Sequence, residues 1–168
     1  MSILSQKISP CLWFDYEAED AANFYVSVFP NSKITTISRY GEAGKEHHRK
    51  PAGSVMVVAF EIEGQSFTAL NGGPIFKFNE AVSFQVMSET QEELDYYWNK
   101  LSEGGDPNAQ QCGWLKDKFG LSWQILSSEV IDMLSDPNYD KSQRAMTAVM
   151  EMKKIDIAAV KKAYCNAS

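Results

Sequence analysis

Few residues in this sequence have side chains that commonly carry metal or nucleophilic chemistry. The histidines are His47 and His48, which are neighbours in the polar loop of residues 45–50. Because adjacent loop residues seldom face one centre, we expect both on the surface rather than in a metal site. Cys11 and Cys112 have no histidine close to them in the sequence, so a buried apolar role is favoured over a nucleophile for each.

Composition and charge exclude several classes of partner. The chain has 168 residues, a formal net charge of −6 and no basic run that offsets it, so we expect it to bind neither nucleic acid nor an anionic membrane. No apolar run approaches the roughly 20 residues that span a bilayer, and no export signal is recognisable. Three cysteines without a CxxC pair argue against a disulfide framework and favour the cytoplasm.

Motifs for phosphate or cofactor binding are missing. The glycines of residues 41–44 lack the spacing of a phosphate loop, and no helix is expected after them. No glycine-rich turn joins a strand to a helix in the manner of a doubly wound fold, which argues against S-adenosylmethionine. We therefore expect no cofactor.

The first half of the chain predicts a strand, a helix and a hairpin. Residues 8–14 are an apolar strand, and apolar residues at helical spacing from Ala21 to Val28 predict a helix that ends before Pro30. A strand over 33–40 and a hairpin of 54–62 with 66–71, turning at 63–65, follow.

The second half repeats this order. Residues 81–87 predict a strand, Thr90 and Glu93 suit the start of a helix as a capping box, and residues 112–126 predict a second hairpin turning near 118–120. The buried face of the helix is expected to contain Leu94, Tyr97, Trp98 and Leu101. The chain is therefore a degenerate internal duplication.

Four stretches carry a family resemblance, namely PCLWFDYEAEDAANFYVSVFPNSKI, FTALNGGP, AVSFQV and CGWLKDKFGLSWQIL. Together they resemble the PhnB-like branch, labelled 3-demethylubiquinone-9 3-methyltransferase-like, of the vicinal oxygen chelate (glyoxalase/bleomycin-resistance) superfamily. The resemblance implies an α+β fold in which two βαβββ modules, at about 8–74 and 81–127, form an open curved mixed sheet. Residues 1–127 would then be one domain that holds a small ligand on its concave face, and 128–168 a helical extension packed on it.

The resemblance also maps the metal ligands of relatives onto this chain. The four positions are Pro10, Thr68, Ala81 and Gln124, and none is a histidine, carboxylate or thiolate. A divalent first-row ion needs three or four such ligands, so we expect the metal site to be lost. Gln124 then either contacts a ligand or satisfies buried polar groups, and both alternatives stay open.

Strand alternation assigns the remaining side chains of the concave face. Trp123, Ile125, Phe67, Val82 and Phe84 are expected to face the helices. The predicted ligand-binding residues are Leu12, Phe14, Thr68, Leu70, Ser83, Gln85, Ser122 and Gln124. Such a mainly apolar face with neutral hydrogen-bonding groups suits a neutral or aromatic small molecule.

Two classes of function remain. A small-molecule-binding protein is favoured over a metal-independent enzyme acting on an aromatic or quinone-like substrate, because the assigned face offers no group for proton transfer. Glu61 or Glu63 would favour the enzyme if either pointed inward, and a purely structural domain would require a filled cavity. The tail predicts three short helices, and because edge strands of this fold often meet a second subunit, we expect a homodimer.

Overall fold

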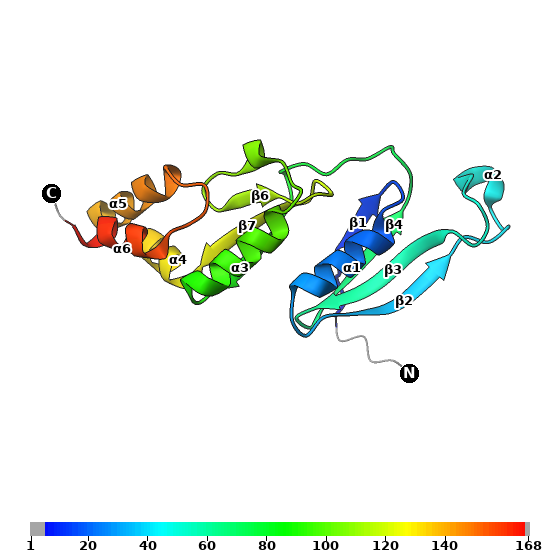
Figure 1. Cartoon of the computed structure of the whole chain (residues 1–168), viewed down its shortest axis with the longest axis horizontal. Coiled ribbons are helices and arrows are strands. Elements are labelled where there is room, and N and C mark those ends of the chain that lie inside the picture. The colour runs from blue at the N-terminus through cyan, green and yellow to red at the C-terminus, as the bar shows by residue number, and fades with distance from the viewer. Residues whose placement is uncertain (1–5, 167–168) are drawn as a thin grey trace. The chain divides into compact units, whose positions relative to one another are not determined.

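The computed structural model describes residues 6–166 and divides the chain into two units at Lys77 and Phe78. The first unit contains one four-stranded sheet in the order β1-β4-β3-β2, in which β1 is parallel to β4 and the other pairs are antiparallel. Figure 1 labels its elements in chain order. They are β1 (Cys11–Phe14), α1 (Ala18–Val28), β2 (Lys33–Arg39), α2 (Lys45–His48), β3 (Val55–Ile62) and β4 (Gln65–Asn71).

Helix α1 packs on this sheet through an aromatic core. The Tyr25 ring of α1 stacks on Phe60 of β3 at 6.2 Å, and Phe60 stacks on Phe67 of β4 at 5.4 Å. The helix begins where the Asn71 side chain accepts a hydrogen bond from the Ala18 backbone N–H at 2.9 Å. A residue at the end of β4 therefore caps α1.

The hairpin of β3 and β4 turns where the sequence predicted. Glu63 and Gly64, with φ of 47° and 80°, occupy the two left-handed positions of a two-residue turn. Ile62 pairs with Gln65 directly across it, so the turn sets the register of both strands.

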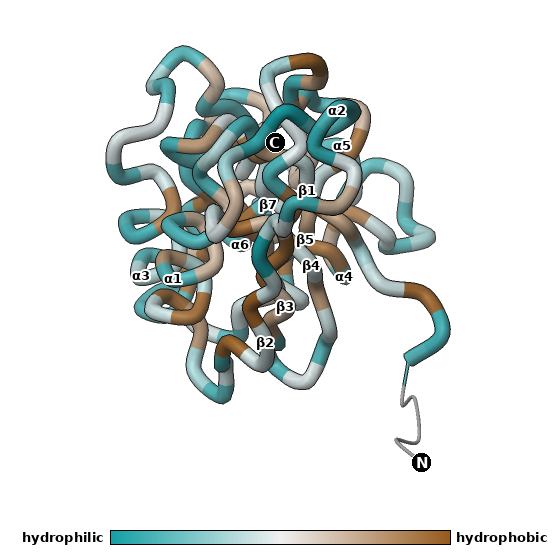
Figure 2. The backbone as a smooth tube through the Cα atoms, turned by 90° about the vertical axis from the view of Figure 1, so that its right-hand side faces the viewer, coloured by the Kyte–Doolittle hydropathy of each residue, from teal (hydrophilic) through white to brown (hydrophobic). Residues whose placement is uncertain are grey.

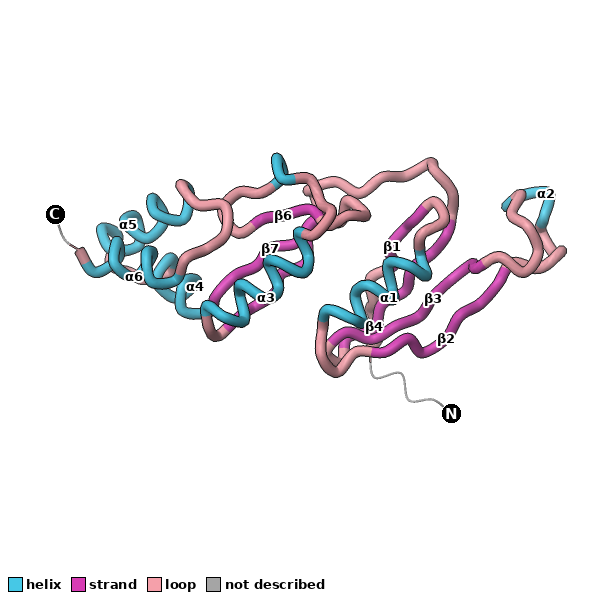
Figure 3. Tube along the Cα trace, viewed as in Figure 1, coloured by secondary structure: helices cyan, strands magenta, loops and turns pink. Residues whose placement is uncertain are grey.

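The second unit begins with β5 (Ser83–Ser88), α3 (Gln91–Ser102), β6 (Trp114–Lys116) and β7 (Ser122–Ser127), and its sheet has the order β5-β7-β6. Figure 3 shows α3 alongside this sheet. Thr90 accepts from the Glu93 N–H at 3.2 Å, which confirms the predicted start of the helix.

The expected second βαβββ module is short of one strand. Where the first unit has β2, the second has turns and the 3-10 helix η1 (Pro107–Ala109). Proline cannot donate to a sheet, and a Cβ added to Gly105 would lie 2.0 Å from the Lys116 carbonyl oxygen. This loop therefore lies tightly against β6 instead of pairing with it as a strand.

Three helices complete the second unit, as the sequence predicted: α4 (Ser128–Leu134), α5 (Tyr139–Met150) and α6 (Ile157–Cys165). The segment between α5 and α6 binds the backbone of Cys112, whose N–H donates to the Met152 carbonyl at 2.7 Å. Gln91 of α3 donates to the Ile155 carbonyl and accepts from the Ile157 N–H. The extension is thereby attached to β6 and α3, while the grouping of residues 1–127 into one domain stays a prediction.

Helices α1 and α3 and strands β3 and β4 each bury one side. Brown hydrophobic and teal hydrophilic positions alternate along the backbone in Figure 2. The buried sides meet in the sheet–helix layers, with Tyr25 and Leu94 at 0% exposure and Ile125 also at 0%. Within residues 6–166, no helix has the length and apolar character needed to cross a membrane.

Candidate functional site

Each sheet has one face that packs on its long helix and one that points away from it, called here the distal face. In the second unit, Trp123 and Ile125 point towards α3 and are 3% and 0% exposed. Residues paired in register share a face, so Gln124 lies on the distal face with its partners Gln85 and Trp114. Alternation in β7 therefore holds as predicted, whereas Val82, expected to face the helices, lies before β5 and is 66% exposed.

The next row of the same distal face contains Ser122 between its partners Ser83 and Lys116. Sequence reasoning assigned Ser83 and Ser122 to this face but missed Trp114 and Lys116. The signal available in the sequence was the apolar Leu115 between these two residues, because alternation turns its neighbours to the opposite face. Leu115 is indeed buried, at 1% exposure.

A row of hydrogen bonds connects the polar side chains of the distal face. Gln124 Nε2 donates to Ser83 Oγ at 2.8 Å, and Gln85 Nε2 approaches Gln124 Oε1 at 3.5 Å. A glutamine amide carries two N–H donors and an oxygen with two lone pairs. After these bonds, Gln124 retains both a donor and an acceptor for a further group.

Ser122 is a second polar group on this face. It is 1% exposed, and its Oγ has no hydrogen-bond partner among the residues that the structure describes. A buried hydroxyl without a partner is costly, and such groups commonly bind water or a ligand.

The turn before β7 fixes the direction of Gln124 through a buried carboxylate that the sequence analysis missed. Asp117 is 2% exposed. Its Oδ1 accepts from the backbone N–H groups of Phe119 and Leu121 at 2.8 and 3.1 Å, and its Oδ2 accepts from Trp123 Nε1 at 2.9 Å. An aspartate three residues before a turn glycine is typical of such a turn and was the available signal.

In the first unit, Thr68 and Leu70 lie on the distal face, as predicted. Their partners in β1 are Cys11 and Trp13. Leu12 and Phe14 instead pair with Ala69 and Asn71, on the face that packs against α1, and are 5% and 4% exposed.

The predicted place of Leu12 and Phe14 on the concave face is therefore wrong. The Thr68 N–H donates to the Pro10 carbonyl at 3.0 Å, and this long-range bond belongs to a register that turns the odd-numbered residues of β1 outward. Cys11 is exposed in consequence, which also contradicts its expected buried role.

Trp13 is held on the distal face by the Asn-Gly-Gly-Pro segment. Its Nε1 donates to the Gly73 carbonyl at 2.8 Å, and its ring meets Phe76 edge-on at 4.9 Å. A Cβ added to Gly72 would lie 2.2 Å from the indole, so only glycine fits there.

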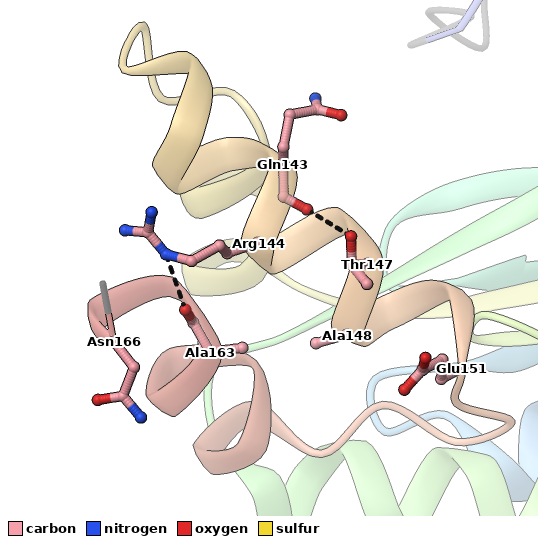
Figure 4. A pocket seen from close by; sticks show the side chains of 7 residues that line it. All are labelled: Gln143, Arg144, Thr147, Ala148, Glu151, Ala163 and Asn166. Carbon is pink, nitrogen blue, oxygen red and sulfur yellow. Dashed lines mark hydrogen bonds between the residues drawn. The ribbon is translucent and has the colours of Figure 1, made fainter. Parts of the chain in front are cut away.

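Two hollows lie elsewhere. One of about 360 Å³ in the first unit contains the Lys50–Asp15 ion pair, with Nζ and Oδ1 3.8 Å apart. The other, of about 450 Å³, lies between α5 and α6 (Figure 4). Its cation, Arg144, already donates to the Ala163 and Tyr164 carbonyls at the end of α6. Neither hollow contains a residue of the predicted site.

Comparison with known proteins identifies the family. The family described as 3-demethylubiquinone-9 3-methyltransferase matches residues 6–126. The chain belongs to this PhnB-like family. Helices α4 to α6 lie beyond the matched residues. No match was found among curated proteins.

Several solved structures are similar to this chain, and one of them supports the family assignment. The PhnB protein of Bacillus cereus, described as a 3-demethylubiquinone-9 3-methyltransferase, is 39% identical, with a TM-score of 0.60 over 72% of this chain and 99% of that chain. Protein PA1353 of Pseudomonas aeruginosa is 19% identical, with a TM-score of 0.56 over 73% of this chain and 98% of that chain. The fosfomycin resistance protein FosX of Listeria monocytogenes is 16% identical, with a TM-score of 0.47 over 74% and 93% of the two chains.

The superfamily's metal does not fit the residues of this PhnB-like chain. At the four mapped positions, Pro10 and Ala81 have no donor atom, Thr68 offers a neutral hydroxyl and the Gln124 amide is bonded to Ser83. Residues 6–166 contain no group of three or more histidine, cysteine or acidic side chains that could hold an ion.

The histidines also have structural partners. His48 Nδ1 accepts from the Lys50 N–H at 2.9 Å, and its ring lies 4.5 Å from that of Tyr40. His47 Nε2 lies 3.3 Å from Glu46 on the surface. Both histidines lie in α2 and belong to neither sheet.

Proposed function

We propose that this PhnB-like protein binds an aromatic small molecule on the distal face of sheet β5-β7-β6, and that the superfamily's metal site is lost in it. The observation that supports the proposal is the hydrogen-bonded row of Ser83, Gln124 and Gln85, on a face that points away from α3. Trp114, the register partner of Gln124 in β6, adds a half-buried aromatic ring to the same row.

The chemistry of this row suits an aromatic ligand with a polar substituent. The Trp114 indole offers a flat apolar surface, and aromatic rings pair favourably with it in offset or edge-on arrangements. The Gln124 amide both donates and accepts, so it can bind a ligand carbonyl, hydroxyl or amide. In the first unit, Thr68, Leu70 and Trp13 give the distal face of β1 and β4 a similar mixture of apolar and neutral polar groups.

A metal-independent enzyme acting on an aromatic or quinone-like substrate is the second candidate. It is favoured by the description of the family and of the Bacillus cereus relative as 3-demethylubiquinone-9 3-methyltransferases. Of the two carboxylates that the sequence raised for this role, Glu61 alternates with Phe60 onto the distal face of β3 in the first unit but lies 3.4 Å from Lys33 Nζ. Binding without chemistry is preferred because this carboxylate is already ion-paired, and no cofactor is proposed.

Replacing Gln124 by leucine tests the binding role. Native mass spectrometry of the purified protein first identifies a co-purified small molecule, and its affinity is then measured for wild type and Gln124→Leu. Loss of one neutral hydrogen bond should weaken binding by about 0.5–1.5 kcal/mol, or roughly 2- to 13-fold, with little change in thermal stability. Gln143→Leu, an exposed amide on α5, is the matched control.

The opposite pattern would refute the proposal. If Gln124→Leu lowers the melting temperature while ligand affinity holds, the Gln124 amide stabilises the sheet by hydrogen bonding within it and does not contact a ligand.

The same mass spectra count subunits, and we propose a homodimer located in the cytoplasm. A monomer at micromolar concentration would contradict the assembly without affecting the binding site.

A further inference from the structure

We propose that the ligand of this site is an aryl acid, whose carboxylate replaces Glu80 as the partner of Lys116 and is bound by the hydroxyl of Ser122. This inference rests on the proposed function and names its ligand class. Three observations carry it: the ion pair of Lys116 with Glu80, the unpartnered Ser122 hydroxyl and the position of Trp114.

The Lys116 side chain is ion-paired. Its ammonium binds the Glu80 carboxylate, and Glu80 lies just before β5. Strands β6 and β5 are separated by β7, so their backbones are about 10 Å apart. The ion pair thus joins β6 to the segment before β5, on either side of β7 and at the end of the sheet where Ser122, the register partner of Lys116, begins β7.

Ser122 is a buried hydroxyl beside Lys116 in the sheet register. Lys116 is 25% exposed, and Ser122 next to it is 1% exposed with no partner for its Oγ among the described residues. In the proposed bound state, Lys116 leaves Glu80 and turns with the Ser122 hydroxyl towards the ligand. A group placed there meets an ammonium and a hydroxyl donor together.

The donors at this place match a carboxylate. Ser83 Oγ already accepts a hydrogen bond from Gln124 at 2.8 Å, so the hydroxyl proton of Ser83 remains available to an acceptor on the ligand. Lys116, Ser122 and Ser83 thus present donors to a single row of the distal face. Charge-assisted hydrogen bonds of this type are stronger than neutral ones, which favours an ionised acid over an amide or alcohol.

In the free protein, the Glu80 carboxylate is bound to Lys116 where the ligand carboxylate would bind. Its side chain is 62% exposed, and the hydrogen bond from Lys116 lowers its pKa below the ordinary value. Solvent-exposed ion pairs contribute little to stability, so exchange of one carboxylate for another has a small cost. The ligand carboxylate thus displaces the Glu80 carboxylate from the Lys116 ammonium.

The aryl part of the ligand follows from the next row of the face. Trp114 and Gln124 are each two residues along the strand from Lys116 and Ser122, which is about 7 Å. A ring linked to a carboxylate by a short spacer spans this distance. 3-Phenylpropionate is therefore the acid probe, and 3-phenylpropionamide is its neutral counterpart of equal shape.

Isothermal titration of wild type, Lys116→Met and Glu80→Gln with both probes tests the inference. Wild type should bind the acid at least fivefold more tightly than the amide. Lys116→Met should weaken acid binding about tenfold and leave amide binding unchanged. Glu80→Gln should strengthen acid binding two- to fivefold, because it removes the competing carboxylate. Lys100→Met, an exposed lysine on α3, should change neither.

The outcomes separate this inference from the proposed function. If the amide binds as tightly as the acid and Lys116→Met changes neither, the acid class is overturned, while a loss of binding in Gln124→Leu would still support the site. If neither probe binds, the inference also fails. Melting temperatures of all variants are measured, and Glu80→Gln, which alters an exposed side chain, gives the decisive result if Lys116→Met does not fold.

Discussion

Replacing Asp117 by asparagine should destabilise the second unit more than any other single-atom change in the hairpin of β6 and β7. The substitution keeps an oxygen for the Phe119 and Leu121 N–H groups, which lie 2.8 and 3.1 Å from Oδ1. It puts an NH₂ group where Oδ2 now accepts from Trp123 Nε1 at 2.9 Å. Two donors then face each other in a place that is 2% exposed.

The magnitude follows from this one contact. A hydrogen bond to a charged group contributes about 1.5–3 kcal/mol, and a buried donor left without a partner costs about 1–3 kcal/mol. These effects overlap, because the same indole N–H is counted in both. We therefore expect Asp117→Asn to lower the free energy of unfolding by about 2–4 kcal/mol.

Urea denaturation followed by far-UV circular dichroism measures this loss. Asp106→Asn is the matched control, because Asp106 makes a similar bond to the Asn108 N–H at 2.9 Å on the surface. It should change the stability by less than about 0.5 kcal/mol. Trp123→Phe removes the indole N–H donor that opposes the new NH₂ group. The double variant should therefore lose less free energy of unfolding than the sum of the losses of the two single variants.

The double variant provides the refutation. If Asp117→Asn and Trp123→Phe have additive effects within about 0.5 kcal/mol, the two side chains are not coupled and the reasoning fails. It also fails if Asp117→Asn alone is no more harmful than Asp106→Asn.

Three further predictions concern other parts of the chain. Asn71→Ala should cost about 1–3 kcal/mol in urea denaturation, because the buried Ala18 N–H loses its acceptor. Cys112→Asn should raise the urea midpoint by an amount equivalent to about 0.5–1 kcal/mol, because Cys112 has φ +52° in a turn position that asparagine prefers. The hydrogen bond between Tyr164 and Asp136 lowers the pKa of Asp136 from 3.8 and raises that of Tyr164 from 10.0. Its contribution should therefore be lost as pH falls through the lowered Asp136 pKa or rises through the raised Tyr164 pKa. Amide exchange protection of α6 should show this, and Tyr164→Phe should abolish the dependence.

Local signals were sufficient to predict the elements themselves. The helix start at Thr90 depends on residues within one turn, and Gly64 and Gly120, with φ of 80° and 85°, mark the two turns directly. The duplication was visible because both halves repeat the order of strand, helix and hairpin. Periodicity and turn chemistry act over a few residues, so the sequence alone displays them.

The errors lie where a distant partner decides the outcome. Strand β1 has four residues, and all of its residues are apolar, so alternation could not tell Leu12 and Phe14 from Cys11 and Trp13. Parallel pairing with β4, more than 50 residues later, fixes which pair turns outward. The missing outer strand of the second unit has a similar cause, because the close approach of Gly105 to β6 depends on the packing of the hairpin.

Stability and ligand contact are divided between the two faces of each sheet, and this division makes the proposals separable by experiment. Asp117 and Asn71 are 2% and 6% exposed, and each positions a strand or helix through bonds made on the buried side. Gln124 lies on the opposite face, where its bonds join side chains and no backbone group depends on it. A change at Asp117 should therefore reduce both stability and binding, because it releases the strand that carries Gln124. A change at Gln124 should reduce binding alone, which is the behaviour of a contact residue on a rigid support.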